Sequence, residues 1–279
     1  MMYHKHTYIL KLLCISLCLN MLQAADTNTT IRIMPLGDSL TYDNTYADAV
    51  HPRPDGIRTG YRGYLWYMLK DANYTADFVG SQRAGYDVKP PIDPDHEGHM
   101  GMTSHEIAAL IYDSLALYQP DIILLHAGTN DHTSTPSGVE AILNQINYYK
   151  STSGKDVRVI VAQLMARRAP DARIDIFNKK LKELVYAHML KGEHLQLVDM
   201  YHDASIPSSH YVDATHPDAY GYSRMAAVWF KALTSPYNPA LRSYPGTVVS
   251  STYIKDIVFD DAADTVTFTT EIPDTGITF

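Results

Sequence analysis

The sequence has only two cysteines among its 279 residues, Cys14 and Cys18, and both lie within its first two dozen residues. Beyond that segment a disulfide framework is excluded, so stability must come from a packed hydrophobic core. The chain also lacks a block of lysine and arginine, and its net charge at pH 7 is −8. A nucleic acid partner is therefore not expected, because phosphate contacts need clustered positive charge.

The first residues of the chain have a distinct composition. A basic start with Lys5 and Lys11, an apolar run over residues 12–19 and the small pair Ala24-Ala25 follow one another. This three-part layout is typical of a secretory signal peptide, and the apolar run is too short to span a bilayer. We therefore expect a signal peptide over residues 1–24 and a secreted, extracellular protein with no membrane contact after its removal. A buried N-terminal helix is the alternative.

Residues 26–245 alternate between apolar strand-like runs and segments of helical periodicity, which predicts βα units around a parallel sheet. The expected strands are Ile31–Leu36, Ala76–Gly80, Asp121–His126, Val157–Gln163 and Leu195–Asp199. The expected helices are Tyr61–Ala72, Thr103–Tyr118, Pro136–Lys150, Asp171–Lys191 and Pro217–Leu233. Because the strands are apolar on both faces, we predict an α/β fold, a three-layer α/β/α sandwich with a mostly parallel, five-stranded central sheet.

The pattern changes from Gly246 onward. Two strand-like segments, Thr252–Phe259 and Thr265–Ile272, flank an acidic turn. They predict a β-hairpin within a β-rich C-terminal extension over residues 246–279. A lone hairpin is marginally stable in water, so we expect it to dock onto the α/β domain. The alternative is that it begins a second β module.

Reactive side chains follow the ends of the expected strands, where ligands gather in open α/β sheets. The first strand leads into Gly37-Asp38-Ser39, and the small glycine allows a tight turn that lifts the Ser39 hydroxyl above the sheet edge. An ordinary turn is the alternative. The third strand leads into Gly128–Asp131, where the amide of Asn130 can donate to the oxygen of an acyl intermediate. An Asx-turn before the next helix is the alternative there.

A histidine precedes the last expected helix, within Asp213–Pro217. Pro217 suits a first helical turn and keeps His216 extended just before it. Asp213 can then accept from Nδ1 of the imidazole, which leaves Nε2 facing Ser39. We therefore predict Ser39, His216 and Asp213 as catalytic residues. A helix-entry feature without catalytic role is the alternative.

These residues, in this order, resemble the SGNH (GDSL-type) hydrolase superfamily, in which four sequence blocks supply a serine, a glycine, an asparagine and a histidine. The corresponding residues here are Ser39, Gly101, Asn130 and His216. Further segments resemble the acetylxylan esterases of carbohydrate esterase family three, namely Met34–Thr41, Gly60–Arg62, Asp77–Ser81, His96–His99 and Gly128–Asp131. The resemblance implies a flavodoxin-like SGNH fold and an oxyanion hole formed by the amides of Ser39 and Gly101 and the side chain of Asn130.

The resemblance also implies a substrate and a mechanism. It predicts a secreted serine esterase that removes acetyl groups from plant-wall polysaccharide such as acetylated xylan, with no metal or cofactor. Tyr61, Arg62 and His99 are the expected substrate-binding residues. Met102 stands where relatives usually have an aromatic residue, which affects the expected shape of the acyl or sugar pocket. The alternatives are a lipid or short-chain ester hydrolase of the same fold and a catalytically silent carbohydrate-binding protein.

His96 and His99 raise the separate question of a metal site. Their spacing, His-Glu-x-His, differs from the His-Glu-x-x-His helix of zinc proteases. We therefore expect these histidines to order the loop rather than to bind a metal.

Overall fold

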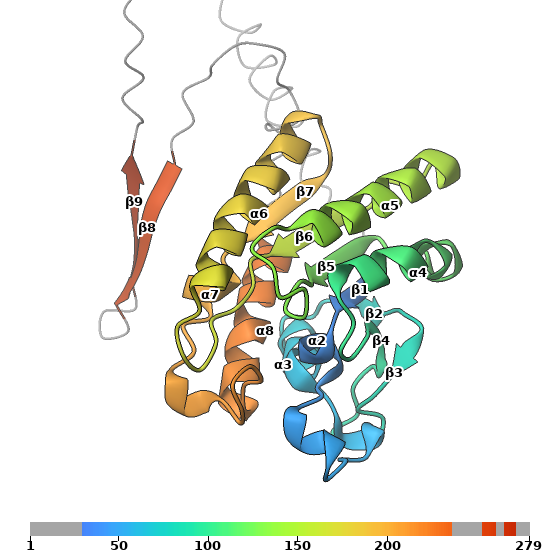
Figure 1. Cartoon of the computed structure of the whole chain (residues 1–279), viewed down its shortest axis with the longest axis vertical. Helices are drawn as coiled ribbons and strands as arrows, with labels where there is room; N and C mark the ends of the chain where they lie inside the picture. Colours follow the sequence, from blue (N-terminus) through green and yellow to red (C-terminus); the bar gives the residue numbers. More distant parts are fainter. Residues whose placement is uncertain (1–29, 236–252, 261–264, 272–279) are drawn as a thin grey trace, which may run out of the picture.

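The computed structural model describes residues 30–235, 253–260 and 265–271. The expected signal peptide, residues 1–24, lies outside the described residues. In the described part of the chain a central sheet has helices packed on both of its faces (Figure 1). The predicted α/β class and layer order are therefore confirmed.

The central sheet has seven strands in the order β3-β4-β1-β5-β6-β7, and β2 pairs with β1. The strands are β1 Ile31–Gly37, β2 Ala76–Phe78, β3 Gln82–Arg83, β4 Asp95–Gly98, β5 Ile122–His126, β6 Arg158–Ala162 and β7 Leu195–Val198. All pairs are parallel except β3 with β4. The five predicted strands are present, and β3 and β4 add two short ones. These two were missed because their residues are polar or glycine and show no apolar run.

Five long helices connect or cover these strands, close to the predicted ranges. They are α3 Gly60–Asp71, α4 Ser104–Tyr118, α5 Ser137–Ser153, α6 Ala172–Leu190 and α8 Ala219–Thr234. Shorter turns of helix are α2 Ser39–Tyr42, α7 Met200–Asp203 and the 3₁₀ segments Tyr46–Ala49, Asp55–Ile57 and Ser208–His210. Side chains at Thr103, Asp171 and Asp218 accept from backbone N–H groups at the starts of α4, α6 and α8, which satisfies groups that the helices leave unpaired.

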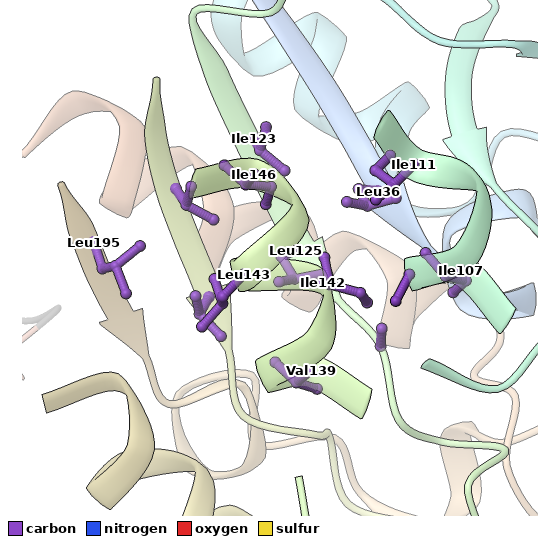
Figure 2. Close-up of a cluster of buried hydrophobic side chains, with 14 of the residues drawn as sticks. Leu36, Ile107, Ile111, Ile123, Leu125, Val139, Ile142, Leu143, Ile146 and Leu195 are labelled. Atoms are coloured by element: carbon purple, nitrogen blue, oxygen red, sulfur yellow. The ribbon is translucent and has the colours of Figure 1, made fainter. Parts of the chain in front are cut away.

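The core consists of two clusters, one on each face of the sheet. The first cluster packs α4, α5 and α6 against one face, with Ile111, Ile142 and Leu125 among its buried members (Figure 2). The second packs α3 and α8 against the other face and contains Tyr61 and Trp229. Neighbouring residues of β5 contribute to opposite clusters, which explains why the strand sequences are apolar throughout.

Strands β8 Tyr253–Asp260 and β9 Thr265–Glu271 pair antiparallel with each other. Docking of this pair onto the α/β domain stays a prediction. None of the helices among the described residues combines the length and the apolar character that crossing a membrane requires.

Candidate active site

Ser39 follows the central strand of the sheet. β1 lies between β5 on one side and β2 and β4 on the other, so its carboxyl end opens at the middle of the sheet edge. A Cβ atom at Gly37 would overlap the carbonyl oxygen of His126, so the close approach of the two strands requires glycine here. Asp38 Oδ1 accepts from the backbone N–H of Leu40 at 3.0 Å and caps the short helix α2, which begins at Ser39.

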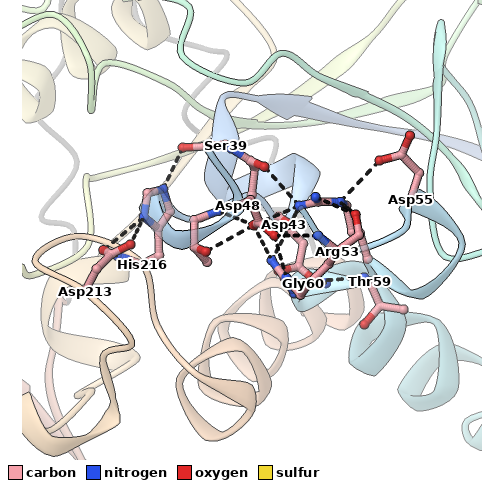
Figure 3. Close-up of polar contacts among 12 residues, drawn as sticks. Ser39, Asp43, Asp48, Arg53, Asp55, Thr59, Gly60, Asp213 and His216 are labelled. Atoms are coloured by element: carbon pink, nitrogen blue, oxygen red, sulfur yellow. Dashed lines mark hydrogen bonds and ion pairs between the residues drawn. The ribbon is translucent and has the colours of Figure 1, made fainter. Parts of the chain in front are cut away.

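The structure brings the three predicted catalytic residues into one hydrogen-bonded chain (Figure 3). Ser39 Oγ lies 2.9 Å from His216 Nε2. On the other side of the imidazole, Nδ1 lies 2.8 Å from Asp213 Oδ2 and 3.0 Å from Oδ1. A carboxylate only accepts hydrogen bonds, so Nδ1 carries the proton and Nε2 is free to accept from the serine hydroxyl.

The loop around Asp213 holds this carboxylate in its charged form. Burial alone would raise the pKa of Asp213, but hydrogen bonds from the N–H groups of His216, Tyr46 and Thr215 and from the His216 ring outweigh it, so the pKa is lowered. The three backbone bonds measure 2.7, 3.0 and 2.8 Å. The ionised carboxylate is therefore placed to stabilise a positive charge that forms on His216.

Gly101 and Asn130 lie in two loops at the same edge of the sheet as Ser39. Gly101 has a φ of 76°, in the left-handed region that favours glycine. Asn130 Nδ2 donates to the carbonyl oxygen of Met102 at 3.0 Å. Ser104 donates through its backbone N–H and its hydroxyl to the carboxylate of Asp131, which ties the two loops together a second time. The loops that carry these two predicted oxyanion donors are thus hydrogen-bonded to each other.

The loop that carries Gly101 is also fixed to the serine turn, because the backbone N–H of His99 donates to the carbonyl oxygen of Gly37 at 2.8 Å. The imidazole of His99 points elsewhere: Nε2 lies 2.8 Å from Glu97 Oε1. Glu97 is fully buried and also accepts from Ser81 and Ser114. Burial would raise the pKa of Glu97, but these hydrogen bonds and the one to His99 lower it. His99 therefore orders this loop, and its predicted contact with substrate stays a prediction.

His96 and His99 make different hydrogen bonds. Its Nδ1 accepts from the backbone N–H of Gly98 at 3.0 Å, and burial lowers the pKa of the ring well below its usual value. Within the described ranges, no group of three or more histidine, cysteine, aspartate or glutamate side chains is arranged to hold a metal ion.

Tyr61 and Arg62 are both fully buried, and their predicted contacts with substrate stay a prediction. The Tyr61 hydroxyl lies 3.1 Å from Thr41 Oγ1, and its ring packs near Trp229. The Arg62 guanidinium donates to the carbonyl oxygens of Thr41, Arg58 and Ala84. Burial lowers the pKa of Arg62 to about 10, so it stays charged at neutral pH.

Both residues thus hold helix α3 against the serine turn. The position of Tyr61 could have been anticipated from the sequence, since it shares the spacing of Leu65 and Leu69 along one face of α3.

Tyr46 contacts His216 and Asp213, which was not anticipated from the sequence. Its ring centroid lies 5.0 Å from that of His216, at an interplanar angle of 87°. Its hydroxyl lies 3.1 Å from Thr215 Oγ1. The surrounding segment, residues 43–60, has no apolar periodicity, and a contact across about 170 positions leaves no local signal.

A network of ion pairs builds the loop that carries Tyr46 (Figure 3). The Asp48 carboxylate lies 2.9 Å from Arg53 Nη2 and 2.9 Å from Arg58 Nη1, and Asp43 Oδ1 lies 3.1 Å from Arg53 Nη2. Asp43 also accepts from the backbone N–H groups of residues 59 and 60 at the start of α3. Burial would raise the pKa of Asp48, but the hydrogen bonds it accepts lower that pKa strongly.

Comparison with known proteins agrees with this geometry. The sequence model of the family described as "GDSL-like Lipase/Acylhydrolase" matches residues 33–229, which is more than half of the chain and includes Ser39, Gly101, Asn130, Asp213 and His216. A "Multidomain esterase" from Ruminococcus flavefaciens is 28% identical over 234 residues. The match covers 73% of this chain but only 28% of that protein, so the chain corresponds to a part of its length.

Solved structures similar to this one include two carbohydrate esterases. A "family 3 carbohydrate esterase" from Clostridium thermocellum has 30% sequence identity and a TM-score of 0.60, and the match covers 73% of this chain and 94% of that one. A "carbohydrate esterase family 3" from Talaromyces cellulolyticus has 24% identity and a TM-score of 0.61, over 73% of this chain and 96% of that one. The second similarity shows the shared fold alone.

Proposed function

Because the chain belongs to the GDSL-like lipase/acylhydrolase family, we propose that it is a secreted serine esterase that removes acetyl groups from acetylated xylan or a similar plant-wall polysaccharide. The observation that carries the proposal is the hydrogen-bonded chain from Ser39 through His216 to Asp213 at the carboxyl end of the central strand. The similarity to the family 3 carbohydrate esterase of Clostridium thermocellum supports a carbohydrate substrate. The signal-like composition of residues 1–24 supports secretion.

In the proposed mechanism, His216 Nε2 accepts the hydroxyl proton as Ser39 Oγ attacks the acetyl carbonyl carbon. The carbonyl oxygen becomes an oxyanion, which accepts from the amides of Ser39 and Gly101 and from Asn130 Nδ2. His216 then donates its proton to the sugar oxygen as the ester bond breaks, and the acetyl group remains on Ser39. Water attacks this acyl-enzyme with His216 as the base, which releases acetate and restores the serine.

The loop contacts support the role of Asn130 as a donor. Its side-chain NH₂ has two hydrogens, and one is committed to the carbonyl oxygen of Met102. That bond fixes the orientation of the amide, so the direction of the second N–H is set before the substrate binds. Donors that need no reorganisation stabilise a developing charge more effectively than mobile ones.

The composition of the loops at the site is the basis for expecting a sugar rather than a long acyl chain, because residues 42–61 and 86–99 are rich in aspartate, histidine, proline, arginine and tyrosine. Each methylene of an acyl chain contributes about 0.8 kcal/mol only where apolar surface covers it. A hollow of about 390 Å³ lies beside the loop that carries His216. Its polar lining residues include Asp43, Asp48, His51, Arg53, Tyr64 and Asp218. Its lining also includes Ala47, Val212, Pro217 and Ala219, so the hollow presents both polar and apolar surface.

The decisive experiment measures acetate release from acetylated xylan by the wild type, Ser39→Ala and a matched control, Ser223→Ala. Ser223 lies on α8, and its hydroxyl bonds only to the carbonyl oxygen of Tyr220 among the contacts described. We expect Ser39→Ala to lose nearly all activity with an unchanged thermal melt, and Ser223→Ala to keep it. A Ser39→Ala protein that releases acetate at a rate near wild type contradicts the proposal.

A series of aryl esters distinguishes the polysaccharide deacetylase from a lipid hydrolase of the same fold. We expect kcat/KM to be highest for the acetyl ester, lower for butyrate and negligible for octanoate. A maximum at eight or more carbons would favour the lipid hydrolase.

A further inference from the structure

Tyr46 contacts the loop that carries Asp213 and His216 at three points. Its backbone N–H donates to Asp213 Oδ2 at 3.0 Å, its hydroxyl lies 3.1 Å from Thr215 Oγ1, and its ring stands perpendicular to the ring of His216. The side chain is nevertheless 59% exposed. Burial of apolar surface therefore does not account for its placement, and the polar and ring contacts set it.

We infer that Tyr46 is a positioning residue for His216, an inference that rests on the proposed esterase function. Nε2 of the imidazole faces Ser39 and Nδ1 faces Asp213, so both nitrogens lie in the plane that catalysis needs. The ring of Tyr46 lies at 87° to the imidazole plane and blocks rotation of the imidazole toward the tyrosine. Tyr46 thus keeps Nε2 directed at the serine before attack and at the sugar oxygen after proton transfer.

The loop beneath Tyr46 is built to hold this position. Asp48 accepts from the backbone N–H of Thr45 at 2.7 Å and from its hydroxyl at 3.0 Å, at the start of the 3₁₀ segment Tyr46–Ala49. Arg53 and Arg58 hold the same carboxylate from the other side. The main chain of Tyr46 is therefore fixed independently of its side chain. Substitution at this position removes the ring and the hydroxyl but keeps the N–H bond to Asp213.

Two variants separate the parts of the side chain. Tyr46→Phe keeps the ring and loses only the bond to Thr215, whereas Tyr46→Ala loses both. We expect Tyr46→Ala to lower kcat on aryl acetate on the order of tenfold, a part of the ~10²–10⁴ that a positioned acid–base group supplies, with KM changed less than twofold. Tyr46→Phe should keep kcat within about twofold of wild type, because the ring still restricts the imidazole.

The matched control is Tyr220→Ala. Tyr220 is 46% exposed, and its ring packs on a histidine, His210, at 4.2 Å, but that histidine bonds to Asp218 rather than to Ser39. Loss of activity in the control as great as in Tyr46→Ala would show a general effect of removing an exposed tyrosine and would overturn the inference. Tyr46→Leu, which keeps apolar bulk, replaces the alanine variant if that protein melts at a lower temperature.

Acetylated xylo-oligosaccharide as a second substrate completes the test. The sugar oxygen is a poorer leaving group than a phenolate and depends more on proton donation by His216, so we expect a larger loss of kcat there than on the aryl ester. Unchanged kcat for Tyr46→Ala on both substrates, or a rise in KM alone, would overturn the inference while the Ser39-dependent activity of the wild type upholds the proposed function. A wild type without Ser39-dependent activity would overturn the proposed function and the inference with it.

Discussion

Asp213→Asn is the substitution that tests the proposed hydrogen-bonded chain most sharply, because it keeps the shape of the side chain and changes one acceptor into a donor. Asp213 Oδ1 accepts from the backbone N–H groups of Thr215 and His216, and Oδ2 accepts from Tyr46 N–H. The ring Nδ1 of His216 reaches both oxygens, with Oδ2 the nearer. The new NH₂ group must therefore face N–H donors in either of its two orientations.

The two orientations differ in cost. With NH₂ at the Oδ1 position, the backbone N–H groups of Thr215 and His216 both lose their acceptor, at about 1–3 kcal/mol each. With NH₂ at the Oδ2 position, only the N–H of Tyr46 is left without one, because the imidazole of His216 can shift its proton to Nε2 and accept at Nδ1. The second orientation is cheaper by roughly one unpaired N–H group.

That cheaper orientation removes the catalytic tautomer, since a protonated Nε2 cannot accept from Ser39. The equivalent change in serine proteases lowers kcat about 10⁴-fold for this reason, and we expect a loss of at least ~10³-fold here. The assay is kcat on aryl acetate, with thermal melts to confirm folding. A loss of less than tenfold would refute the reasoning and leave Ser39 and His216 as the active unit.

Asp199→Asn is the matched control for this experiment. Asp199 also bonds to a histidine three positions later, with its carboxylate 2.8 Å from His202 Nδ1 and 2.9 Å from the backbone N–H of His202. His202 lies on α7 and Asp199 directly precedes this helix, and neither residue makes a described contact with Ser39. We expect the control variant to keep wild-type kcat.

Two further predictions concern the proposed oxyanion hole and the ion-pair network around Asp48. Asn130→Ala should lower kcat on aryl acetate on the order of a hundredfold, with a smaller change in KM, since it removes one oxyanion donor, and a loss below fivefold would contradict that role. Asp48→Asn should destabilise the protein at pH 7 by about 3 kcal/mol in chemical denaturation, because the buried Arg58 loses its buried carboxylate partner and keeps only the exposed carboxylate of Asp55. The pKa of Asp48 is lower in the folded protein, so the carboxylate stabilises the fold above its unfolded pKa near ~3.9, and this contribution is lost as the pH falls through the folded pKa. The difference between variant and wild type should therefore be full at neutral pH and shrink below about pH 4, and a difference that does not depend on pH would contradict the role of the charge.

The sequence predicts the sheet well where burial imposes a pattern. β1, β5 and β6 are buried on both faces, so their apolar runs mark them clearly. β4 escaped prediction because its residues, Asp95–Gly98, include charged and histidine side chains whose hydrogen-bond partners come from other segments. Main-chain pairing with β1 and β3 makes it a strand, and that pairing leaves no trace in a local window.

The residues of the candidate site could likewise be predicted only where the sequence carries a local pattern. Ser39, Asn130 and His216 could be named from the sequence because each follows a strand or precedes a helix, where the fold gathers reactive groups. Arg62 was expected to contact substrate because a charged residue near the serine turn suggests a ligand contact, and nothing in the sequence indicates that backbone carbonyls accept from its guanidinium inside the protein. Tyr46 was missed because its partners lie about 170 positions away.

The position of the two proposed reacting side chains along the chain has a consequence for biosynthesis. Ser39 follows β1 and His216 precedes α8, and the bond between them spans 177 positions. A ribosome therefore completes the serine turn long before it adds the imidazole, and α8, which follows the His216 loop, is made later still. We expect every chain that ends before His216 to be inert toward esters, so that hydrolysis begins only after the His216 loop and α8 have been translated.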